Sequence, residues 1–302
     1  MSIVLLTMFF LFSFMPREET LTITSDGETI ISIHRTEFAD PILGRAIMDE
    51  EKYQELEESI ANQVYTKPVN AKLDEYGQIV PEETGKSLDR RVFKELFYDY
   101  YYGSERTSIE VPTFTLFAKV DKELLKDIRA VQMGAYVTYY NTYNRQRAHN
   151  ITLATESINN YVVFPNERFS FNKVVGKRTA ERGYLPAPVI VRGELTEGIG
   201  GGICQVSSTL FNAVDKAGMN ILERYTHSKR VTYVPPGRDA TVSWYGPDFV
   251  FTNRHNQPIL LLAKTYNGTL LVKVYSSEEI DYTPRDVPRA PNKLPPEIDV
   301  ND

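Results

Sequence analysis

The sequence contains a single cysteine, a single tryptophan and four histidines among 302 residues. One cysteine excludes an internal disulfide, and one cysteine with scattered histidines lacks the ligand spacing of a zinc site. The net charge of -6 gives no electrostatic basis for binding nucleic acid. No Gly-Lys-Ser or Gly-Lys-Thr follows the glycine run near residue 200, which argues against a phosphate-binding loop. We therefore expect no cofactor, no metal and no nucleic-acid partner.

The sequence also lacks a stretch of about 20 apolar residues, the length that a membrane span needs. The apolar run from Ile3 to Met15 is shorter, no Lys or Arg precedes it, and no Ala-x-Ala cleavage site follows it. A buried helix is one interpretation of this run. Its position ahead of the polar Arg17-Glu18-Glu19 favours an export signal or anchor, which we place at residues 1–20. We therefore expect an extracytoplasmic protein that is tethered to the membrane through this segment.

The only cysteine lies in a stretch that is typical of a glycine loop leading into a helix. Gly200, Gly201 and Gly202 precede Cys204, and apolar residues then recur at three- and four-residue steps up to a glycine that would end the helix. These residues are Val206, Leu210, Ala213, Val214, Ala217 and Gly218. The free N–H groups and the positive dipole end of a helix stabilise a thiolate, so we expect Cys204 to ionise readily.

The same loop offers groups that could hold a substrate. Its three glycines allow close approach, and their N–H groups can form a nest for a developing oxyanion. The polar side chains of Gln205 and Ser207 follow in the first helical turn. The alternative is a small buried cysteine that only packs the loop. The glycines and polar residues around Cys204 favour the reactive cysteine.

Local patterns along the chain predict an α+β fold. In residues 21–133 we expect a small α+β region, with a hairpin over 21–35, helices over 49–65 and 88–98, strands over 68–73, 78–81 and 108–115, and a helical connector over 121–133. In residues 134–275 we expect a β-rich domain in which the cysteine helix is embedded. Its other elements are a helix over 150–161, an extended segment over 164–172, and strands over 134–140, 231–234, 249–253, 259–263 and 270–274. Residues 276–302 are acidic and proline-rich without periodicity, and we expect them to be disordered.

The stretch from about Tyr139 to Tyr275 resembles the VanW domain along its whole length. The matching residues are Arg147, Asn150-Ile151, Phe169-Ser170-Phe171-Asn172, Val175-Gly176-Lys177-Arg178-Thr179, Gly183-Tyr184, the run from Gly200 to Leu210, Glu223-Arg224, His227-Ser228, Tyr233-Val234-Pro235, Gly237, Asp239-Ala240 and Asp248-Phe249. Asn166 and Phe211 depart from the usual glycine and tyrosine of the family, and neither touches the Cys, His or Asp positions.

The region ahead of this stretch has a looser resemblance. Residues 68–71, 77–82 and 85–89 are similar to a proposed peptidoglycan-binding domain that is often found ahead of VanW domains. The order of strand, turn, strand and helix is shared, although such patterns are common in other proteins. The resemblance implies that residues 21–133 contact the cell wall.

The VanW family was first named from glycopeptide-resistance clusters, and its domains have been identified as L,D-transpeptidases. They make 3→3 peptidoglycan cross-links through a cysteine, so the resemblance implies that Cys204 accepts an acyl group from a stem peptide. His227 matches the family motif and is the candidate base. Asp239 is the candidate that orients it, with Asp248 as the alternative, because a base needs a partner to fix its tautomer.

Two arginines could recognise the substrate. Arg178 and Arg224 have the bidentate fork that binds a carboxylate of a stem peptide, although either could form a surface salt bridge instead. The sequence therefore supports two functions. The first is a cysteine acyl-transferase of the cell wall, with hydrolysis when water is the acceptor. The second is a non-catalytic wall-binding or assembly protein whose glycine loop is structural.

Overall fold

The computed structural model describes residues 20–103, 106–191 and 194–292. The segment expected to be an export signal or anchor lies outside these residues, apart from Thr20. Within the described ranges, every helix is too short or too polar to cross a membrane. Contacts divide the chain into two units, Met1–Asn70 with Glu82–Lys119 and Ala71–Pro81 with Val120–Asp302.

The first unit has a mixed α+β composition, as predicted. Its elements are β1 (Thr20–Ser25), β2 (Glu28–His34), the 3-10 helix η1 (Arg35–Phe38), β3 (Ala39–Asp40), β4 (Gly44–Met48), α1 (Glu50–Val64), β7 (Gly85–Leu88), α2 (Arg90–Tyr102), β8 (Ser108–Glu110) and β9 (Thr113–Leu116). β1 pairs antiparallel with β2 and parallel with β8. The predicted hairpin is confirmed, and Asp26 and Gly27 form its turn with positive φ angles of 52° and 80°.

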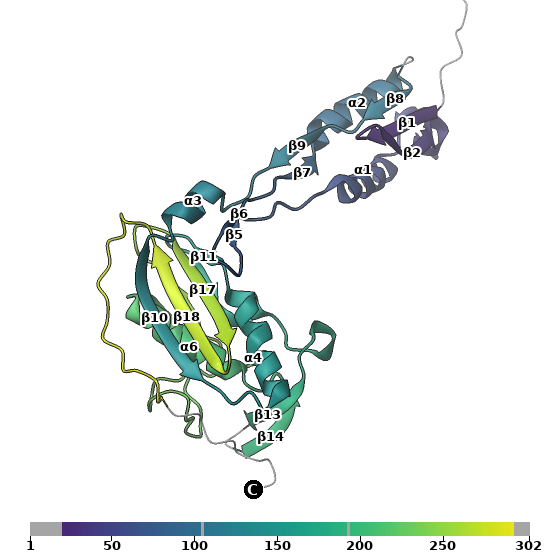
Figure 1. Ribbon diagram of the computed structural model, residues 1–302. Helices are drawn as coiled ribbons and strands as arrows, with labels where there is room; N and C mark the ends of the chain where they lie inside the picture. Colours follow the sequence, from purple (N-terminus) through teal and green to yellow (C-terminus); the bar gives the residue numbers. More distant parts are fainter. Residues whose placement is uncertain (1–19, 104–105, 192–193, 293–302) are drawn as a thin grey trace, which may run out of the picture. The chain divides into compact units, whose positions relative to one another are not determined.

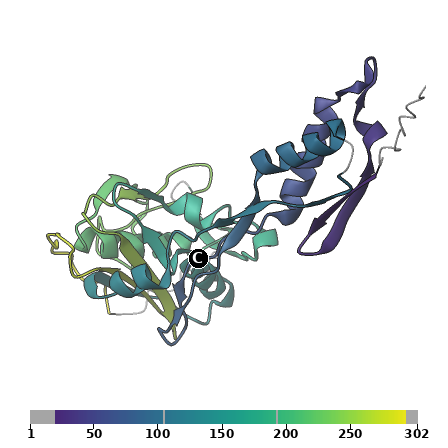
Figure 2. The ribbon, with the colours of Figure 1, turned by 90° about the horizontal axis from the view of Figure 1, so that it is seen from above.

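Helices α1 and α2 lie side by side in this unit (Figure 2). The Asp49 side chain caps α1 by accepting hydrogen bonds from the N–H groups of Glu51 and Lys52. The apolar face of α1 then meets aromatic residues of α2, and the Tyr53 and Phe97 ring centroids are 5.0 Å apart. The core of the first unit is therefore largely aromatic.

The second unit contains the cysteine helix. Its elements are β5 (Lys72–Leu73), β6 (Ile79–Val80), α3 (Lys122–Asp127), β10 (Val131–Tyr139), α4 (Arg145–Ile158), β11 (Tyr161–Val163), β12 (Arg168–Ser170), α5 (Phe171–Val175), η2 (Ala180–Arg182), β13 (Pro186–Val191), β14 (Glu194–Ile199), α6 (Ile203–Lys216), β15 (Asn220–Glu223), β16 (Val250–Thr252), β17 (Ile259–Tyr266) and β18 (Thr269–Ser276). The fold class is α+β, and this unit is rich in antiparallel sheet with embedded helices, as predicted.

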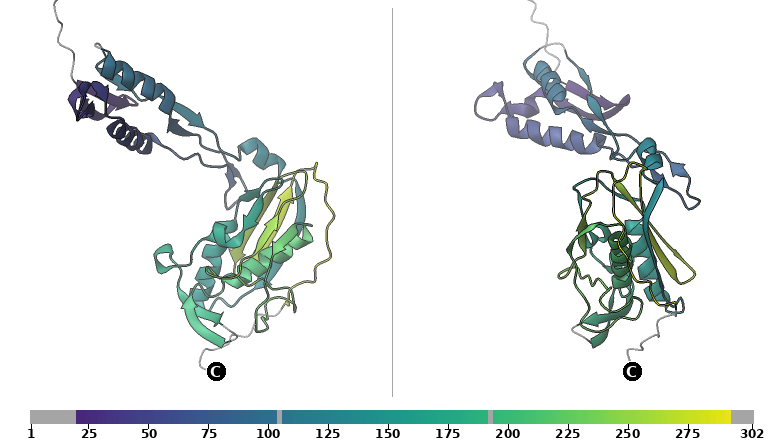
Figure 3. Two further views of the ribbon diagram at one scale, coloured as in Figure 1. Left: turned by 180° about the vertical axis from the view of Figure 1, so that it is seen from behind. Right: turned by 90° about the vertical axis from the view of Figure 1, so that its left-hand side faces the viewer.

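A four-stranded antiparallel sheet in the order β10-β18-β17-β11 is the base of the second unit (Figure 1). Helix α6 packs on β10 and β18, and α4 packs on β17 and α6 (Figure 3). At Gly134 of β10 a Cβ atom would lie 2.5 Å from the carbonyl oxygen of Ala213, so only glycine allows α6 to approach this closely. This contact fixes the height of α6 over the sheet.

The boundary between the units differs from the one expected at residues 133 and 134. The hairpin β5–β6 and helix α3, which the sequence placed in the first region, belong to the second unit. The reason is a small apolar cluster in which Ala71, Val120, Leu125 and Ile128 pack with Leu260 of β17. This cluster covers the side of β17 opposite to the α6 core, since successive strand residues face opposite sides.

The segment Val231–Val234 is not a strand, and this prediction was wrong. Its alternating pattern suits an extended chain, but β15 occupies the place beside β16 where such a strand would pair. Pro235 and Pro236 follow directly and carry no N–H groups for a ladder. The segment instead crosses the surface, and Val234 enters the main core.

The expectation of disorder from residue 276 onward was also wrong for the part that the structure describes. Residues 277–292 are extended and pack on the second unit, with Val287 buried in its core. The Tyr136 hydroxyl donates to the Pro288 carbonyl, and Arg285 forms an ion pair with Asp215 near the end of α6. A segment without periodicity can thus be ordered when individual side chains and carbonyls, irregularly spaced, each contact a different part of the folded unit. Residues 293–302 lie outside the described ranges.

Candidate active site

Helix α6 begins after a turn that requires glycine. Gly202 precedes the helix with a φ of 103°, a conformation that other residues rarely adopt. At Gly201 a Cβ atom would lie 2.6 Å from the carbonyl oxygens of Ala187 and Pro188. The turn therefore sets Cys204 as the second residue of α6, where it is partly exposed. At this end the helix dipole favours a thiolate.

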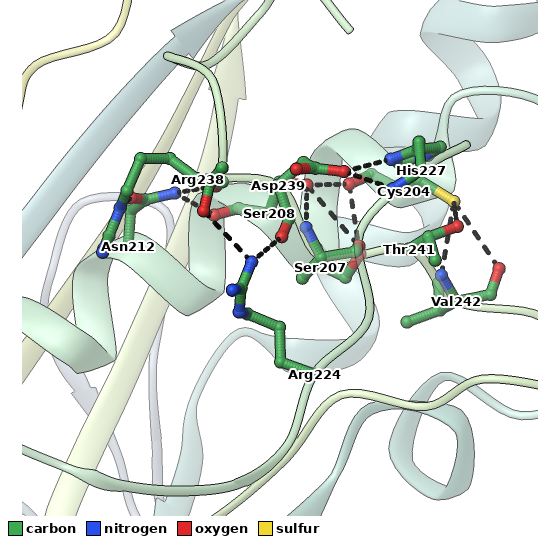
Figure 4. A network of polar contacts seen from close by, with 12 residues as sticks. Cys204, Ser207, Ser208, Asn212, Arg224, His227, Arg238, Asp239, Thr241 and Val242 are labelled. Carbon is green, nitrogen blue, oxygen red and sulfur yellow. Dashed lines mark hydrogen bonds and ion pairs between the residues drawn. The ribbon is translucent and has the colours of Figure 1, made fainter. Parts of the chain in front are cut away.

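The Cys204 sulfur contacts a loop that lies far along the chain (Figure 4). It is 3.7 Å from Thr241 Oγ1 and 3.5 Å from both the backbone nitrogen and the carbonyl oxygen of Val242. The Val242 N–H donates to the sulfur, an arrangement that favours the ionised form. Sequence reasoning missed both residues, because a threonine and a valine carry no chemical signal and only the path of the loop brings them here.

His227 and Asp239 form a tight pair beside the thiol. Asp239 Oδ2 lies 2.6 Å from His227 Nδ1 and also accepts a hydrogen bond of 2.6 Å from the His227 backbone N–H. The two side chains are 7% and 9% exposed, so the pair is largely shielded from water. A carboxylate at Nδ1 fixes the imidazole so that Nε2 is the nitrogen available for proton transfer.

The structure separates the two candidate partners of the imidazole. Asp248 accepts hydrogen bonds from the Ser170 hydroxyl at 2.5 Å and from the Asn172 N–H at 2.9 Å. These contacts hold the start of α5. Asp239, and not Asp248, is therefore the carboxylate that orients His227.

The charges of the site are coupled. Burial acts to raise the pKa of Cys204, but the neighbouring His227, the Val242 N–H and the Thr241 hydroxyl outweigh it, and the pKa lies below that of an ordinary thiol. Burial acts to lower the pKa of His227, but Asp239 and the Cys204 thiolate raise it to about 9. Burial also opposes ionisation of Asp239, whose pKa is nevertheless lowered by His227. The contacts of the site therefore stabilise the thiolate and the imidazolium relative to an isolated thiol and imidazole.

Polar side chains of α6 hold the loop that carries Asp239. Ser207 donates to the Ala240 carbonyl at 2.5 Å, and Ser208 accepts from the Ala240 N–H at 2.9 Å. On the other side, Arg224 donates to the Asp239 carbonyl at 2.7 Å. These contacts fix the loop relative to Cys204 (Figure 4).

The expectation that Gln205 and Ser207 contact a substrate does not fit the structure. Both side chains are fully buried, and Gln205 donates to the Tyr139 carbonyl while it accepts from Arg147. Their polar groups are already used to position α6 and the neighbouring loop. Arg224 Nη1 donates to the carbonyls of Gly237 and Asp239, so part of this guanidinium also holds the loop.

A hollow of about 310 Å³ opens beside the histidine–aspartate pair. Its lining consists of Thr226, His227, Lys229, Arg230, Val231, Pro235, Pro236, Gly237 and Asp239. In the part of the chain that the structure describes, no group of three or more His, Cys, Asp or Glu side chains could hold a metal ion.

These observations define an α+β domain in which a cysteine at a helix start lies beside a histidine–aspartate pair. The family model described as VanW like protein matches residues 146–275, which include all three residues. The chain is 52% identical to the uncharacterized protein YoaR of Bacillus subtilis over 283 residues, which are 94% of this chain and 93% of that protein. The protein therefore belongs to the VanW-like family.

A more distant relative carries a functional name. The chain is 30% identical over 106 residues to the vancomycin B-type resistance protein VanW of Enterococcus faecalis. This match covers 33% of this chain and 38% of that protein. No solved structure shows a significant match.

Proposed function

We propose that this protein is a cysteine acyl-transferase that acts on peptidoglycan stem peptides, of the L,D-transpeptidase type. The proposal is carried by one observation, the Cys204 thiol beside the buried His227–Asp239 pair at the start of α6. A low-pKa thiol with an oriented histidine is the arrangement that activates a cysteine for attack on an acyl carbon. Membership of the VanW-like family and the resistance-associated relative are consistent with a cell-wall substrate.

In the first step the Cys204 thiolate attacks the carbonyl carbon of the scissile peptide bond in a donor stem peptide. A tetrahedral oxyanion forms, and the N–H groups of Gly201, Gly202 and Cys204 are the candidate donors to it. The Gly200 N–H, which the sequence also suggested, already donates to the Leu185 carbonyl. The carbon–nitrogen bond then breaks as the His227 imidazolium gives a proton to the departing amine. The products are a thioester on Cys204 and a free amino acid.

In the second step an amine of a neighbouring stem peptide attacks the thioester. The attacking nitrogen gives a proton to His227, and the thiolate leaves, which restores the thiolate–imidazolium pair. One peptide bond is broken and one is formed, so the exchange needs no oxidant, metal or nucleotide. If water replaces the amine, the same steps give a carboxypeptidase.

We propose that residues 1–20 place the protein outside the cytoplasm and that the first unit contacts peptidoglycan. Sedimentation of the protein with purified insoluble peptidoglycan tests the second of these. The first unit comprises residues 1–70 and 82–119, so the variant that lacks it keeps residues 71–81 and joins them through a short glycine–serine linker to residues 120–302. This variant should stay in the supernatant while the full chain sediments.

The test of the activity is intact-mass spectrometry after incubation with purified tetrapeptide muropeptides. We expect a mass gain equal to the donor minus its terminal amino acid, and no gain in Cys204→Ala. Addition of a second muropeptide should discharge the adduct and yield a cross-linked product. If the folded protein with an alkylatable thiol gains no mass, the acyl-transferase proposal fails. If the thiol is also inert to alkylation, the non-catalytic wall-binding function is favoured.

A further inference from the structure

Arg178 lies against the glycine turn that precedes Cys204. It follows α5, and a Cβ atom on Gly200 would lie 3.1 Å from Arg178 Cβ and 3.2 Å from its Cγ. The guanidinium carbon lies 5.8 Å from the centroid of the Phe171 ring. The side chain is therefore held between an aromatic ring and the turn that positions the thiol.

Both terminal nitrogens of Arg178 are buried and have no hydrogen-bond partner among the described residues. A guanidinium presents five N–H donors, and leaving a buried charge unpaired is unfavourable. The largest effect on its pKa is burial, which lowers it, and the Cys204 thiolate is the strongest of the charges that oppose this. Asp248, a weaker contributor, already accepts hydrogen bonds from Ser170 and two backbone N–H groups.

The neighbouring arginines differ from Arg178 in this respect. Arg224 donates to two backbone carbonyls, and Arg238 donates to Asn212 and Asp215. Arg147 donates to Gln205. These three side chains hydrogen-bond to other parts of the protein, whereas the two terminal nitrogens of Arg178 have no partner in the described part of the chain.

We propose that Arg178 forms a carboxylate subsite, which binds the C-terminal carboxylate of the amino acid that departs when Cys204 is acylated. This inference rests on the proposed function. In such a donor the carboxylate carbon is separated from the scissile carbonyl carbon only by the amide nitrogen and one Cα atom. A cation beside the thiol is thus placed to pair with it by the bidentate fork of arginine. In a longer donor, the residue after the scissile bond is joined through its carboxyl group to a further residue. Such a donor has no free carboxylate to pair with Arg178, so it should bind less well.

The first experiment compares two alkylating reagents of similar size on the full chain. Iodoacetate carries a carboxylate and iodoacetamide does not, and both react with the same thiolate. The ratio of their rates at one pH therefore cancels any change in the thiolate fraction. We expect Arg178→Gln to lower the iodoacetate-to-iodoacetamide ratio by about tenfold, the effect of a lost charge-assisted hydrogen bond. Arg178→Lys, which keeps the charge without the fork, should retain part of the preference.

Arg182 supplies the matched control. It is an exposed arginine close in sequence, and it donates to the Lys177 carbonyl. Arg182→Gln removes the same charge and should leave the reagent ratio unchanged. A ratio in Arg178→Gln equal to that of the wild-type protein overturns the proposal. A ratio that falls equally in both variants also overturns it, since a general loss of positive charge would then explain the result.

A second measurement uses only the wild-type protein, in case the variants do not fold. N-acetyl-D-alanine should slow the alkylation of Cys204 by iodoacetamide, and N-acetyl-D-alanine amide should protect at least about tenfold more weakly. Equal protection by acid and amide overturns the subsite. Because neither measurement requires turnover, the two proposals fail separately. A preserved carboxylate preference without acyl transfer refutes only the activity, and acyl transfer without the preference refutes only the role of Arg178.

Discussion

The two units of the chain bury different kinds of side chain. The core of the first unit contains aromatic residues of α1 and α2, of which Tyr53, Phe93, Phe97 and Tyr100 are at most 1% exposed. Helix α6 in the second unit buries five polar side chains completely. These are Gln205, Ser207, Ser208, Thr209 and Asn212, and each has a hydrogen-bond partner.

This difference indicates what the buried side chains of each region contribute. Apolar side chains of similar volume can replace one another in a core with modest losses, because their contacts are not directional. A buried hydroxyl or amide needs a partner at a defined distance and angle. The polar residues of α6 thus position specific atoms, namely the loop with Asp239 and the backbone around the Cys204 sulfur. The buried aromatic residues of the first unit contribute mainly to its stability, whereas the buried polar residues of α6 fix the positions of the groups around Cys204.

The largest expected effect is the loss of the histidine–aspartate pair. His227→Ala should reduce acyl-enzyme formation by about 10² to 10⁴-fold, the usual contribution of a positioned acid and base. Because the two residues act as one unit, adding Asp239→Ala to this variant should cost little more. Single-turnover acylation followed by mass spectrometry measures both.

If the losses from the two single variants multiply in the double variant, the pair does not act together. Near-normal acylation in His227→Ala would mean that another group supplies the proton. In either case the polar residues of α6 could no longer be said to position a catalytic histidine–aspartate pair, and the comparison with the first unit would fail.

The aromatic core offers the reverse test. Phe97→Ala should lower the free energy of unfolding of the first unit by about 3–5 kcal/mol, since it removes a fully buried ring, while the alkylation rate of Cys204 stays unchanged. The only tryptophan, Trp244, lies in the second unit, so its fluorescence follows that unit, and circular dichroism follows both. We expect an early urea transition in circular dichroism alone. A joint shift of both signals would show that the units unfold together.

The pH dependence of acylation separates the charges of the site. The pKa of His227 is raised from 6.5 to about 9 in the folded protein. Its imidazolium therefore stabilises the fold fully below pH 6.5, and this contribution is lost as the pH rises through about 9. The proton for the leaving amine disappears over the same range, so acylation should fall about tenfold per pH unit above it.

Asp239→Asn should move this fall to lower pH, because the carboxylate is the main group that raises the pKa of His227. The rate of acylation between pH 6 and pH 11 checks both expectations. A rate that rises to a plateau and stays there would mean that only the thiol titrates in this range.

The smallest expected effect concerns one buried hydroxyl of α6. Ser208→Ala leaves the Ala240 N–H without its acceptor, and should lower the free energy of unfolding of the second unit by about 1–3 kcal/mol. Ser59→Ala on the exposed side of α1 is the matched control and should change stability by less than about 0.5 kcal/mol. If the two variants lower the free energy of unfolding equally, the buried hydroxyl of α6 contributes no more to stability than an exposed hydroxyl of α1. Urea unfolding followed by Trp244 fluorescence and circular dichroism measures both.

Features with a local cause could be predicted from the sequence. The turns at Asp26-Gly27 and Asn267-Gly268 need positive φ angles, and the buried face of α1 follows from its spacing. The stretch after Gly202 was correctly predicted as a helix, because its apolar residues recur at three- and four-residue steps.

Features that depend on distant partners could not be predicted. Val231–Val234 has the pattern of a strand but no free neighbour, and residues 277–292 have no pattern but find separate sites on the core. At the candidate site, the sequence nominated Cys204, His227 and Asp239, and the structure brings them together. It could not show that Gln205 is buried or that Val242 lies against the sulfur, since both depend on how two segments meet.

The pairing of β10 with β18 has a consequence for how the site is made. Val131 pairs with Ser276 and Tyr139 with Thr269, so the two strands on which α6 packs come from opposite ends of the second unit. Contacts between residues so distant in sequence slow folding, because a long loop must close before they form. During synthesis α6 therefore leaves the ribosome before one of its two supporting strands exists. The thiol is assembled into its site only after the chain has been extended through β18, at least 60 residues beyond Cys204, so the reactive geometry forms well after the cysteine itself has been synthesised.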